Sequence, residues 1–294
     1  MSQPTLSAAV AGTWSTLSET AHMVEESSAF GLADVVDLDR GDDRAWQGLV
    51  ASPGLDLVVL DAAGDDRPEL VRQLHGAGKA VLLTEPFPMT AGELEELIRL
   101  QAAGGRPIGV LAPHRALLHG AETASPATPF AYGVLEVSDC RPVEAHRWAR
   151  WAPLTRNPET QAALRAVAFH LDLACQLLGA PETVCVSGFD DGTGVGIVNF
   201  ARGCRFVFAV TSRSANRVER LDLLGAGSRI RVADGRVSLE QDFVVRTAEL
   251  PSLISARELL LHEMADAIRT VGRLRYGSLA AGRGLAKILG ELGK

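Results

Sequence analysis

The stretch that decides the fold runs from Leu55 to Leu97 and reads "LDLVVLDAAGDDRPELVRQLHGAGKAVLLTEPFPMTAGELEEL". It contains two continuous apolar runs, at 57–60 and 80–83, and each is followed by a helical pattern. The first pattern opens on a proline and closes on a glycine, and the second begins at a threonine that suits an N-cap. Continuous apolar runs are typical of strands that are buried on both faces, as in parallel sheets covered by helices. The stretch therefore predicts strand–helix–strand units of a parallel sheet.

The same alternation continues over about the first 115 residues. The expected strands are 6–12, 32–39, 55–63, 79–84 and 106–113, and the expected helices are 15–27, 43–52, 67–78 and 90–105. Strands that alternate with helices at this spacing form parallel sheets with right-handed crossovers. We therefore predict a Rossmann-like dinucleotide-binding domain over residues 1–117.

The pattern changes beyond Leu118. One long helix is expected at 158–181, and it is followed by short alternating strands with Gly, Asn or Asp turns and then by two closing helices. Such strands predict an open, mainly antiparallel sheet. The fold class is thus α/β, with a second α+β domain over 118–294 for substrate binding and dimerisation. By topology, a ligand would lie at the carboxyl ends of the parallel strands, between the domains.

Composition limits the classes of partner. Apolar residues make up 47% of the chain, charged residues 22%, and the formal net charge is −7. This balance is typical of a globular protein with a hydrophobic core, and it disfavours nucleic acid and anionic membranes, which need a basic face. We see no apolar run that would span a bilayer and no signal peptide, and the four separated cysteines suggest reduced thiols. We therefore expect a cytoplasmic protein.

The order of elements resembles the Gfo/Idh/MocA family of NAD(P)-dependent oxidoreductases, which is related to biliverdin reductase. The resemblance rests on the 55–97 stretch, on "HLDLACQLLGAPETVCV", on "ERLDLLGAGSRIRVADGRVSL" and on the closing helices, and it covers nearly the whole chain. It implies an NAD or NADP cofactor, a small-molecule substrate and a homo-oligomer that forms through the C-terminal sheet. The chain departs from the family pattern at several functional positions.

The first departure is the cofactor loop. A dinucleotide site favours G-x-G-x-x-G after the first strand, so that backbone amides can approach the pyrophosphate. Here the strand leads into Gly12, Thr13 and Trp14, so one glycine remains and a bulky residue follows. The loop is either a weakened cofactor site or a capped helix start that binds nothing. After the second strand, Asp39 stands where an acid would accept hydrogen bonds from the adenosine ribose.

The second departure concerns "TEPFPMT". Aligned on Pro86, the family's Glu-Lys-Pro motif becomes Thr84-Glu85-Pro86, so a carboxylate replaces the lysine that contacts the substrate hydroxyl. A carboxylate can act as a base or bind a cation, but it does not attract negative charge that develops on oxygen. Glu85 is therefore either a catalytic residue with altered chemistry or a solvent-exposed turn residue.

The third departure lies in the long helix. Anchoring the family pattern on Asp172 places Phe169 where the family has its catalytic histidine, with His170 as the neighbour. We keep His170 as a catalytic candidate and Phe169 as a substrate contact; the alternative for His170 is a structural histidine. His114 and Arg115 follow the fifth strand, where topology favours ligand binding.

Three functions fit these residues. The first is an NAD(P)-dependent oxidoreductase whose substrate, such as an imine, needs no Lys/Asp/His relay. The second is a non-redox lyase or cyclase in which Glu85, His170 or His114 moves protons. The third is a catalytically silent ligand-binding or partner subunit. We predict no metal site, because no suitable ligand spacing occurs.

Overall fold

The chain folds into two compact units. The structure, a computed structural model, describes residues 4–41, 43–62, 66–84, 90–116, 130–138, 158–188, 192–211, 214, 218–233, 236–241, 244–249 and 253–292. The first unit comprises 1–86, 92–116 and 252–281, and the second comprises 87–91, 117–251 and 282–294. The chain therefore passes more than once from one unit to the other.

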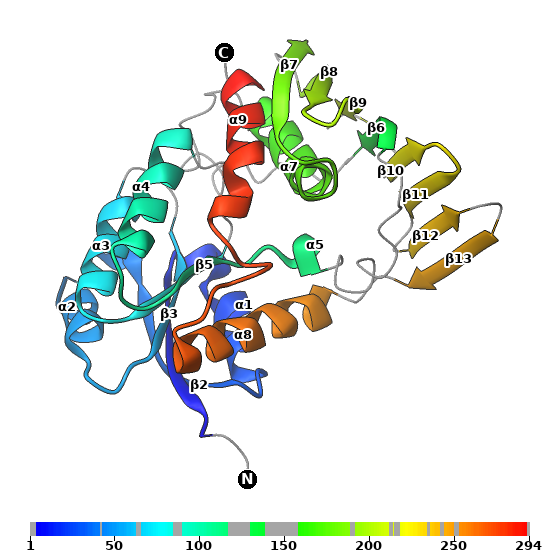
Figure 1. Ribbon diagram of the computed structural model, residues 1–294. Helices are drawn as coiled ribbons and strands as arrows, with labels where there is room; N and C mark the ends of the chain where they lie inside the picture. Colours follow the sequence, from blue (N-terminus) through cyan, green and yellow to red (C-terminus); the bar gives the residue numbers. More distant parts are fainter. Residues whose placement is uncertain are drawn as a thin grey trace. The chain divides into compact units, whose positions relative to one another are not determined.

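The first unit is a parallel sheet between two layers of helices (Figure 1). Its strands are β1 (Leu6–Gly12), β2 (Phe30–Asp37), β3 (Leu57–Asp61), β4 (Ala80–Leu83) and β5 (Ile108–Val110). Its helices are α1 (Trp14–Glu25), α2 (Asp43–Ala51), α3 (Arg67–Gly76), α4 (Ala91–Ala102), α5 (Pro113–Ala116) and α8 (Leu253–Thr270). Helices α2, α3 and α4 lie on one side of the sheet, and α1 and α8 lie on the other. This arrangement confirms the predicted Rossmann-like layer.

The strand order of this sheet is β2-β1-β3-β4-β5. The chain moves from β1 outward to β2 and then returns past β1 to β3, so the direction of winding reverses between β1 and β3. The crevice outside the carboxyl ends of the strands at such a switch point is the usual ligand site of doubly wound sheets. The four residues of β3 from Leu57 to Leu60 are buried, as the continuous apolar run predicts.

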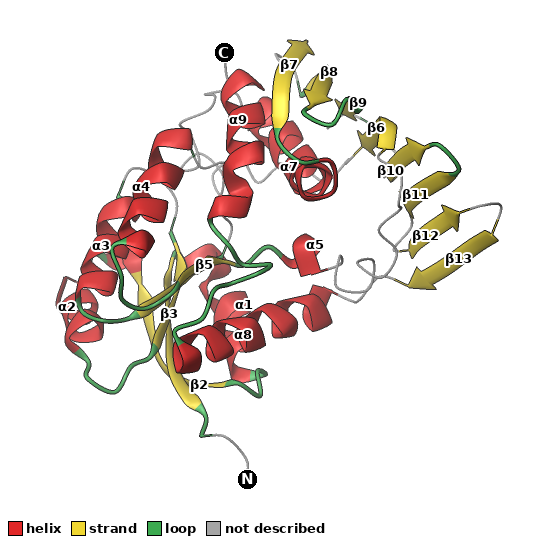
Figure 2. Cartoon of the chain, in the orientation of Figure 1, coloured by secondary structure: helices red, strands yellow, loops and turns green. Residues whose placement is uncertain are grey.

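The second unit is an eight-stranded sheet with two helices on one face (Figure 2). The strands, in spatial order, are β13 (Val244–Glu249), β12 (Arg236–Gln241), β11 (Ser228–Ala233), β10 (Val218–Gly225), β6 (Phe130–Ser138), β9 (Arg205–Thr211), β8 (Thr193–Phe200) and β7 (Pro181–Ser187). The helices are α7 (Pro158–Leu178) and α9 (Arg283–Leu292). The described strand pairs are antiparallel except for β6 with β9, which is parallel, so the sheet is mixed and mainly antiparallel.

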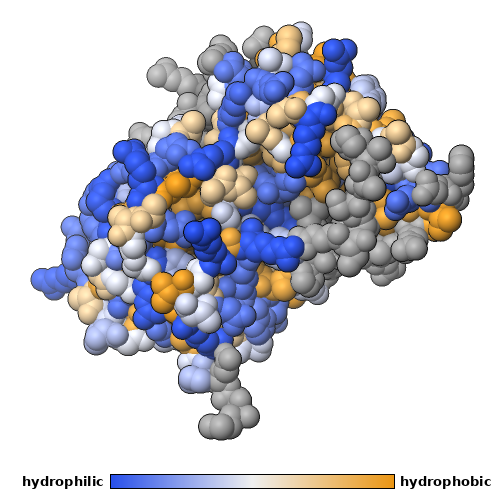
Figure 3. All heavy atoms as spheres, in the orientation of Figure 1, coloured by the Kyte–Doolittle hydropathy of each residue, from blue (hydrophilic) through white to orange (hydrophobic). Residues whose placement is uncertain are grey.

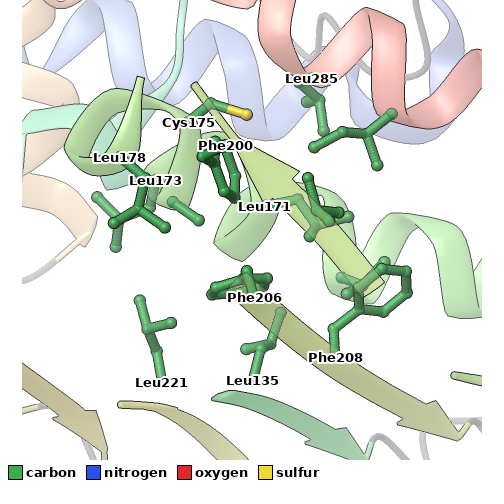
Figure 4. Packing of buried hydrophobic residues seen from close by; sticks show 14 of the residues in the cluster. Leu135, Leu171, Leu173, Cys175, Leu178, Phe200, Phe206, Phe208, Leu221 and Leu285 are labelled. Atoms are coloured by element: carbon green, nitrogen blue, oxygen red, sulfur yellow. The ribbon is translucent and has the colours of Figure 1, made fainter. Parts of the chain in front are cut away.

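The core of the second unit lies between this sheet and α7 (Figure 4). Phe206 and Phe208 of β9 point from the sheet toward Leu171 of α7, and Phe200 meets Phe206 edge to face at 6.1 Å between ring centroids. A Cβ atom on Gly196 would lie 2.2 Å from the Phe208 ring, so this glycine makes room for the ring. The glycines of this sheet are therefore part of its packing.

The helix α8 joins the first unit, although the sequence-based boundary at 117/118 assigns it to the second domain. Polar contacts hold it there: Arg257 contacts Glu19 at 3.0 Å, and Glu258 accepts a hydrogen bond from the Ser28 amide at 3.0 Å. These contacts link residues far apart in the sequence, so local patterns carry no sign of them.

The surface of the first unit is mostly hydrophilic on the face in Figure 3, and hydrophobic residues are scattered among polar ones. Scattered apolar residues are normal on protein surfaces. Among the described residues, no helix is both long enough and apolar enough to cross a membrane.

Candidate functional site

The carboxyl edge of the first sheet brings Gly12, Asp37 and Asp61 together. In the strand register, Gly12 of β1 lies beside Asp37 of β2 on one side and beside Asp61 of β3 on the other. Each is the last residue of its strand. The switch point lies between β1 and β3, so Gly12 and Asp61 lie at the edge where sheets of this topology usually bind a ligand.

Gly12 makes close contact with Asp61. A Cβ atom on Gly12 would lie 2.7 Å from the Asp61 Cβ and 3.0 Å from the Asp61 carbonyl oxygen, so only glycine fits here. The Asp61 carboxylate is half-buried, and its Oδ2 accepts a hydrogen bond from the Thr20 hydroxyl of α1 at 3.4 Å. Gly12, the one glycine left in the expected cofactor loop, is thus required because Asp61 packs against it, whether or not a cofactor binds.

The first turn of α1 follows Gly12 closely. Thr13 precedes the helix in an extended conformation, and its carbonyl oxygen accepts a hydrogen bond from the Leu17 amide at 3.0 Å. Trp14 is the first helical residue; its side chain is outside the described set. The first amides of a helix lack helical acceptors and attract anions, and the first turn of α1 carries no acidic residue. This turn therefore remains suited to a phosphate group.

The acid at the end of β2 is Asp37. The predicted ribose acceptor Asp39 lies two residues further, in a short 3-10 helix, and it is exposed. Its amide donates to Asp37 Oδ1 at 3.0 Å, and Arg40 Nε contacts Asp37 Oδ2 at 3.2 Å. Asp37 is better placed than Asp39 to meet a ligand at this edge, because it is level with Gly12 in the sheet.

The residue that follows β4 is Thr84. It is buried, and its amide donates to the Leu60 carbonyl oxygen at 3.3 Å. Glu85 and Pro86 lie outside the described residues, so their assignments stay predictions. On the helices that follow β3 and β4, Arg67 forms a buried ion pair with Glu93 at 2.6 Å. This pair links the first turns of α3 and α4.

His114 and Arg115 lie in α5, directly after β5, as the sequence predicts, and both are buried. One guanidinium nitrogen of Arg115, Nη1, donates to the carbonyl oxygens of Tyr276 at 3.2 Å and Ser278 at 2.8 Å. Glu263 of α8 also holds this segment, because its carboxylate accepts hydrogen bonds from the Tyr276 and Gly277 amides, each at 2.9 Å. These bonds give Arg115 a role inside the fold, whereas its predicted substrate contact has no support from them.

Phe169 and His170 are half-buried neighbours on α7, in the second unit. Asp172, the residue on which the alignment was anchored, is completely buried in the same helix, and Gln176 donates to its Oδ1 at 3.5 Å. Its burial indicates a structural role. The roles proposed for Phe169 and His170 stay predictions.

A serine, a histidine and a glutamate meet elsewhere in the first unit. Ser28 Oγ lies 3.0 Å from His262 Nε2, and Glu258 Oε1 lies 3.0 Å from Ser28 Oγ and 3.1 Å from His262 Nε2. A catalytic triad needs the histidine to use different ring nitrogens for the serine and the acid, whereas here Nε2 meets both. The cluster also precedes β2, at the amino edge of the sheet. It is a structural contact between α8 and the Ser28 turn.

This contact changes the acidity of Glu258. Burial alone would raise the pKa of its carboxyl, but hydrogen bonds from the Ser28 amide and hydroxyl outweigh burial, so the pKa lies below its ordinary value of 4.5. The carboxylate therefore stays charged at neutral pH. The described part of the chain contains no group of three His, Cys, Asp or Glu side chains arranged to hold a metal ion.

No protein-family profile and no curated protein sequence matches this chain. Solved structures do match. An oxidoreductase from Agrobacterium radiobacter in complex with NAD+, L-tartaric acid and magnesium superimposes with a TM-score of 0.78 at 15% identity, over 97% of this chain and 94% of the other. An inositol dehydrogenase homologue from Azotobacter vinelandii, complexed with NADH and myo-inositol, gives 0.76 at 15% identity, over 97% and 93%.

Biliverdin reductase from Synechocystis sp. PCC 6803, in complex with biliverdin and NADP+, gives a TM-score of 0.70 at 15% identity, over 98% of each chain. The chain has the Gfo/Idh/MocA fold. The resemblance inferred from the sequence is thereby confirmed for the fold, over nearly the whole chain.

Two residues at the edge of this Gfo/Idh/MocA fold were missed by sequence reasoning. Asp37 is one of several acids in "VVDLDRGDD", and the sequence does not show which of them ends the strand. Asp61 is the acid that ends the apolar run "LVVLD", which is the signal that would have found it. With the α1 amides, these residues form a site that can bind a polar, hydroxyl-bearing ligand.

Proposed function

We propose that the protein is a divergent NAD(P)-dependent oxidoreductase that acts on a small molecule. The observation that carries this proposal is the likeness over 97% of the chain to the inositol dehydrogenase homologue that was solved with NADH and myo-inositol. The doubly wound sheet supports the same function, because Gly12 and the start of α1 follow β1 at its switch point, and sheets of this topology usually bind a dinucleotide there.

The residues at this edge fit most of a dinucleotide. The first amides of α1, after Thr13, would hold the pyrophosphate, and Asp37 would accept hydrogen bonds from the adenosine ribose. An acid at this position favours NAD, while Arg40, which contacts Asp37, would favour the 2′-phosphate of NADP if it turned outward. Thr84 lies at the end of the neighbouring strand and would border the cofactor.

The substrate proposal follows from the altered catalytic positions. When bound, the nicotinamide supplies or accepts a hydride, so the protein must mainly position the two reactants. Thr84-Glu85-Pro86 has a carboxylate where the family has a lysine, which suits a cationic substrate such as an iminium ion. Glu85 and His170 are our candidates for proton transfer, and Phe169, His114 and Arg115 are candidates for the substrate pocket.

Cofactor titration tests the proposal directly. NADH and NADPH would each be titrated by nicotinamide fluorescence and by calorimetry, and we expect binding below millimolar concentration. Replacement of Asp37 with alanine should weaken NADH more than NADPH, and Asp34→Ala, on the exposed part of β2, is the matched control. If neither cofactor binds, the oxidoreductase proposal fails and a non-redox or silent protein is favoured.

Substrate chemistry is tested next. Reduction of a panel of cyclic imines would be followed by NAD(P)H absorbance for the parent and for Glu85→Gln and His170→Gln. A role in proton transfer predicts a loss of turnover of roughly 10²-fold or more with intact cofactor binding. Unchanged turnover would remove the substituted residue from the mechanism.

We further propose a homo-oligomer that forms through the C-terminal sheet. Its face opposite α7 exposes apolar side chains on β10, β6 and β8: Tyr132, Val134, Val195, Ile197 and Leu224 are 36–48% exposed. Large exposed apolar patches are typical of protein interfaces. Ile197→Asp should convert the oligomer to monomer in light scattering, whereas Val35→Asp on β2 should not. An unchanged mass for Ile197→Asp would exclude this face.

A further inference from the structure

We infer that Asp61 is an affinity-determining residue that weakens dinucleotide binding at the start of α1. The inference rests on the proposed cofactor site. It starts from one contact. Gly12 has no side chain, and the space that a side chain would need is filled by Asp61: a Cβ atom on Gly12 would lie 2.7 Å from the Asp61 Cβ. In a dinucleotide loop, that first glycine serves the tight turn that leads to the pyrophosphate.

The Asp61 carboxylate is held in this position. Thr20, a buried residue of α1, donates its hydroxyl to Asp61 Oδ2 at 3.4 Å, so the carboxylate lies against the same helix whose first amides would receive the pyrophosphate. Asp61 is half-buried, and a half-buried charge is screened less by water and salt than an exposed one. Thr20 is the seventh of the twelve residues of α1, so the carboxylate contacts the middle of the helix, while the Asp61 Cβ lies beside Gly12, just before the helix begins.

The positive charges described near this carboxylate are already engaged by other groups of the protein. On the other side of Gly12, the neighbouring strand ends in a second carboxylate, Asp37. Arg40 contacts Asp37 at 3.2 Å. Arg67 contacts Glu93 at 2.6 Å and also donates to the Ala62 carbonyl oxygen, next to Asp61, at 3.4 Å, so its charge is shared with another carboxylate. A pyrophosphate, which carries two negative charges, would therefore meet repulsion from Asp61. The same charge would disfavour ADP and ADP-ribose but leave adenosine unaffected.

The test is a titration of Asp61→Asn with NADH, NADPH, ADP-ribose and adenosine. Asparagine has nearly the same shape and still accepts the Thr20 hydroxyl, so the packing against Gly12 is kept. We expect the dissociation constants of the three phosphate-containing ligands to fall by roughly fivefold or more, and that of adenosine to stay the same. Glu25→Gln, at the exposed far end of α1, makes the same change in net charge and should change none of them.

Salt concentration separates a charge effect from a packing effect. The advantage of Asp61→Asn should shrink as sodium chloride rises from about 20 mM to about 500 mM, because salt screens the repulsion. A gain that does not depend on salt would show relaxed packing and would overturn the inference. Far-ultraviolet circular dichroism and thermal melting check that both variants fold.

The outcomes also separate this inference from the proposed function. If the parent binds NADH and Asp61→Asn binds it equally well, the inference fails and the cofactor site stands. If only Asp61→Asn binds, the inference holds and the parent chain is not a cofactor-dependent enzyme. If neither binds, both are overturned.

Discussion

Arg229 binds the Oδ1 atom of Asp222 through two nitrogens, Nε at 2.9 Å and Nη2 at 2.7 Å. Arg231 Nε contacts the same oxygen at 2.9 Å, and Arg220 Nε contacts Oδ2 at 2.6 Å. The carboxylate is nearly buried, at 8% exposed, while the three arginines are 33–48% exposed. One carboxylate thus organises three cations on the face of the sheet that is opposite α7, across strands β10 and β11.

Replacing this carboxylate should destabilise the second unit. Asp222→Asn keeps the volume but removes the charge that holds three guanidinium groups together, so they would repel one another. Because the arginines are partly exposed and can turn toward water, we expect a loss of about 1–2 kcal/mol in the free energy of unfolding, measured by urea denaturation. Glu136→Gln, an exposed carboxylate on the neighbouring strand, should change it by less than about 0.5 kcal/mol.

The same carboxylate should make stability depend on pH. Burial alone would raise the pKa of Asp222, but the hydrogen bonds from Arg231, Arg220 and Arg229 outweigh burial, so the folded-state pKa lies below its ordinary value of 3.8. A lowered pKa contributes stability that is fully present above the unfolded pKa and is lost as pH falls through the folded one. The difference between the parent and Asp222→Asn should therefore be constant from pH 7 to about 5 and shrink below about 4. Urea titrations at these pH values measure it, and an equal difference at pH 3 would contradict the assignment.

The sequence predicts those parts of the fold that depend on local pattern. The apolar runs at 57–60 and 80–83 are buried parallel strands, as expected, because burial on both faces requires an unbroken apolar run. The long helix at 158–181 likewise appears as α7, which ends at Leu178. The parallel pairing of β6 with β9 and the attachment of α8 to the first unit were not predicted, since they depend on contacts between distant residues.

In the candidate site, too, contacts between residues distant in the sequence decide what the sequence alone does not show. Topology correctly places Arg115 after β5, but the direction of its side chain is set by the carbonyl groups of Tyr276 and Ser278, far along the chain. The register of β1 with β2 and β3 decides that Asp37 and Asp61 flank Gly12, and register is not visible in the sequence of one strand. Residue type gives the candidates, while three-dimensional neighbours decide between them.

The role of Arg115 inside the fold predicts an effect without any ligand. Arg115→Met keeps much of the side-chain length but removes the two hydrogen bonds that Arg115 donates to the carbonyl oxygens of Tyr276 and Ser278. We expect a loss of roughly 2–4 kcal/mol in the free energy of unfolding of the apoprotein. Arg202→Met, at an exposed turn, is the control and should cost less than about 0.5 kcal/mol. An unchanged stability of Arg115→Met would show that these hydrogen bonds do not stabilise the fold.

The cysteines should differ in reactivity. Burial raises the pKa of the Cys204 thiol to about 11, and Cys175 is also buried, while Cys185 is exposed on β7. Since the thiolate is the reactive form, iodoacetamide at pH 8 should label Cys185 before Cys175, and Cys204 only after unfolding. Peptide mapping by mass spectrometry distinguishes the sites. Early labelling of Cys204 in the folded protein would show that the core opens locally.

Two glycines of α9 should respond to alanine in opposite directions. At Gly284, a Cβ atom would lie 2.9 Å from the Sγ of Cys175 and 3.3 Å from Cδ of Pro181, so alanine would crowd the contact of α9 with α7 and β7. At Gly290, a Cβ atom would meet nothing within 4 Å, so alanine gains helix propensity without a clash. We expect Gly284→Ala to lose about 1–2 kcal/mol and Gly290→Ala to gain about 0.5–1 kcal/mol in urea denaturation. Because both changes occur in one helix and add the same methyl group, equal effects would show that α9 does not pack tightly against Cys175.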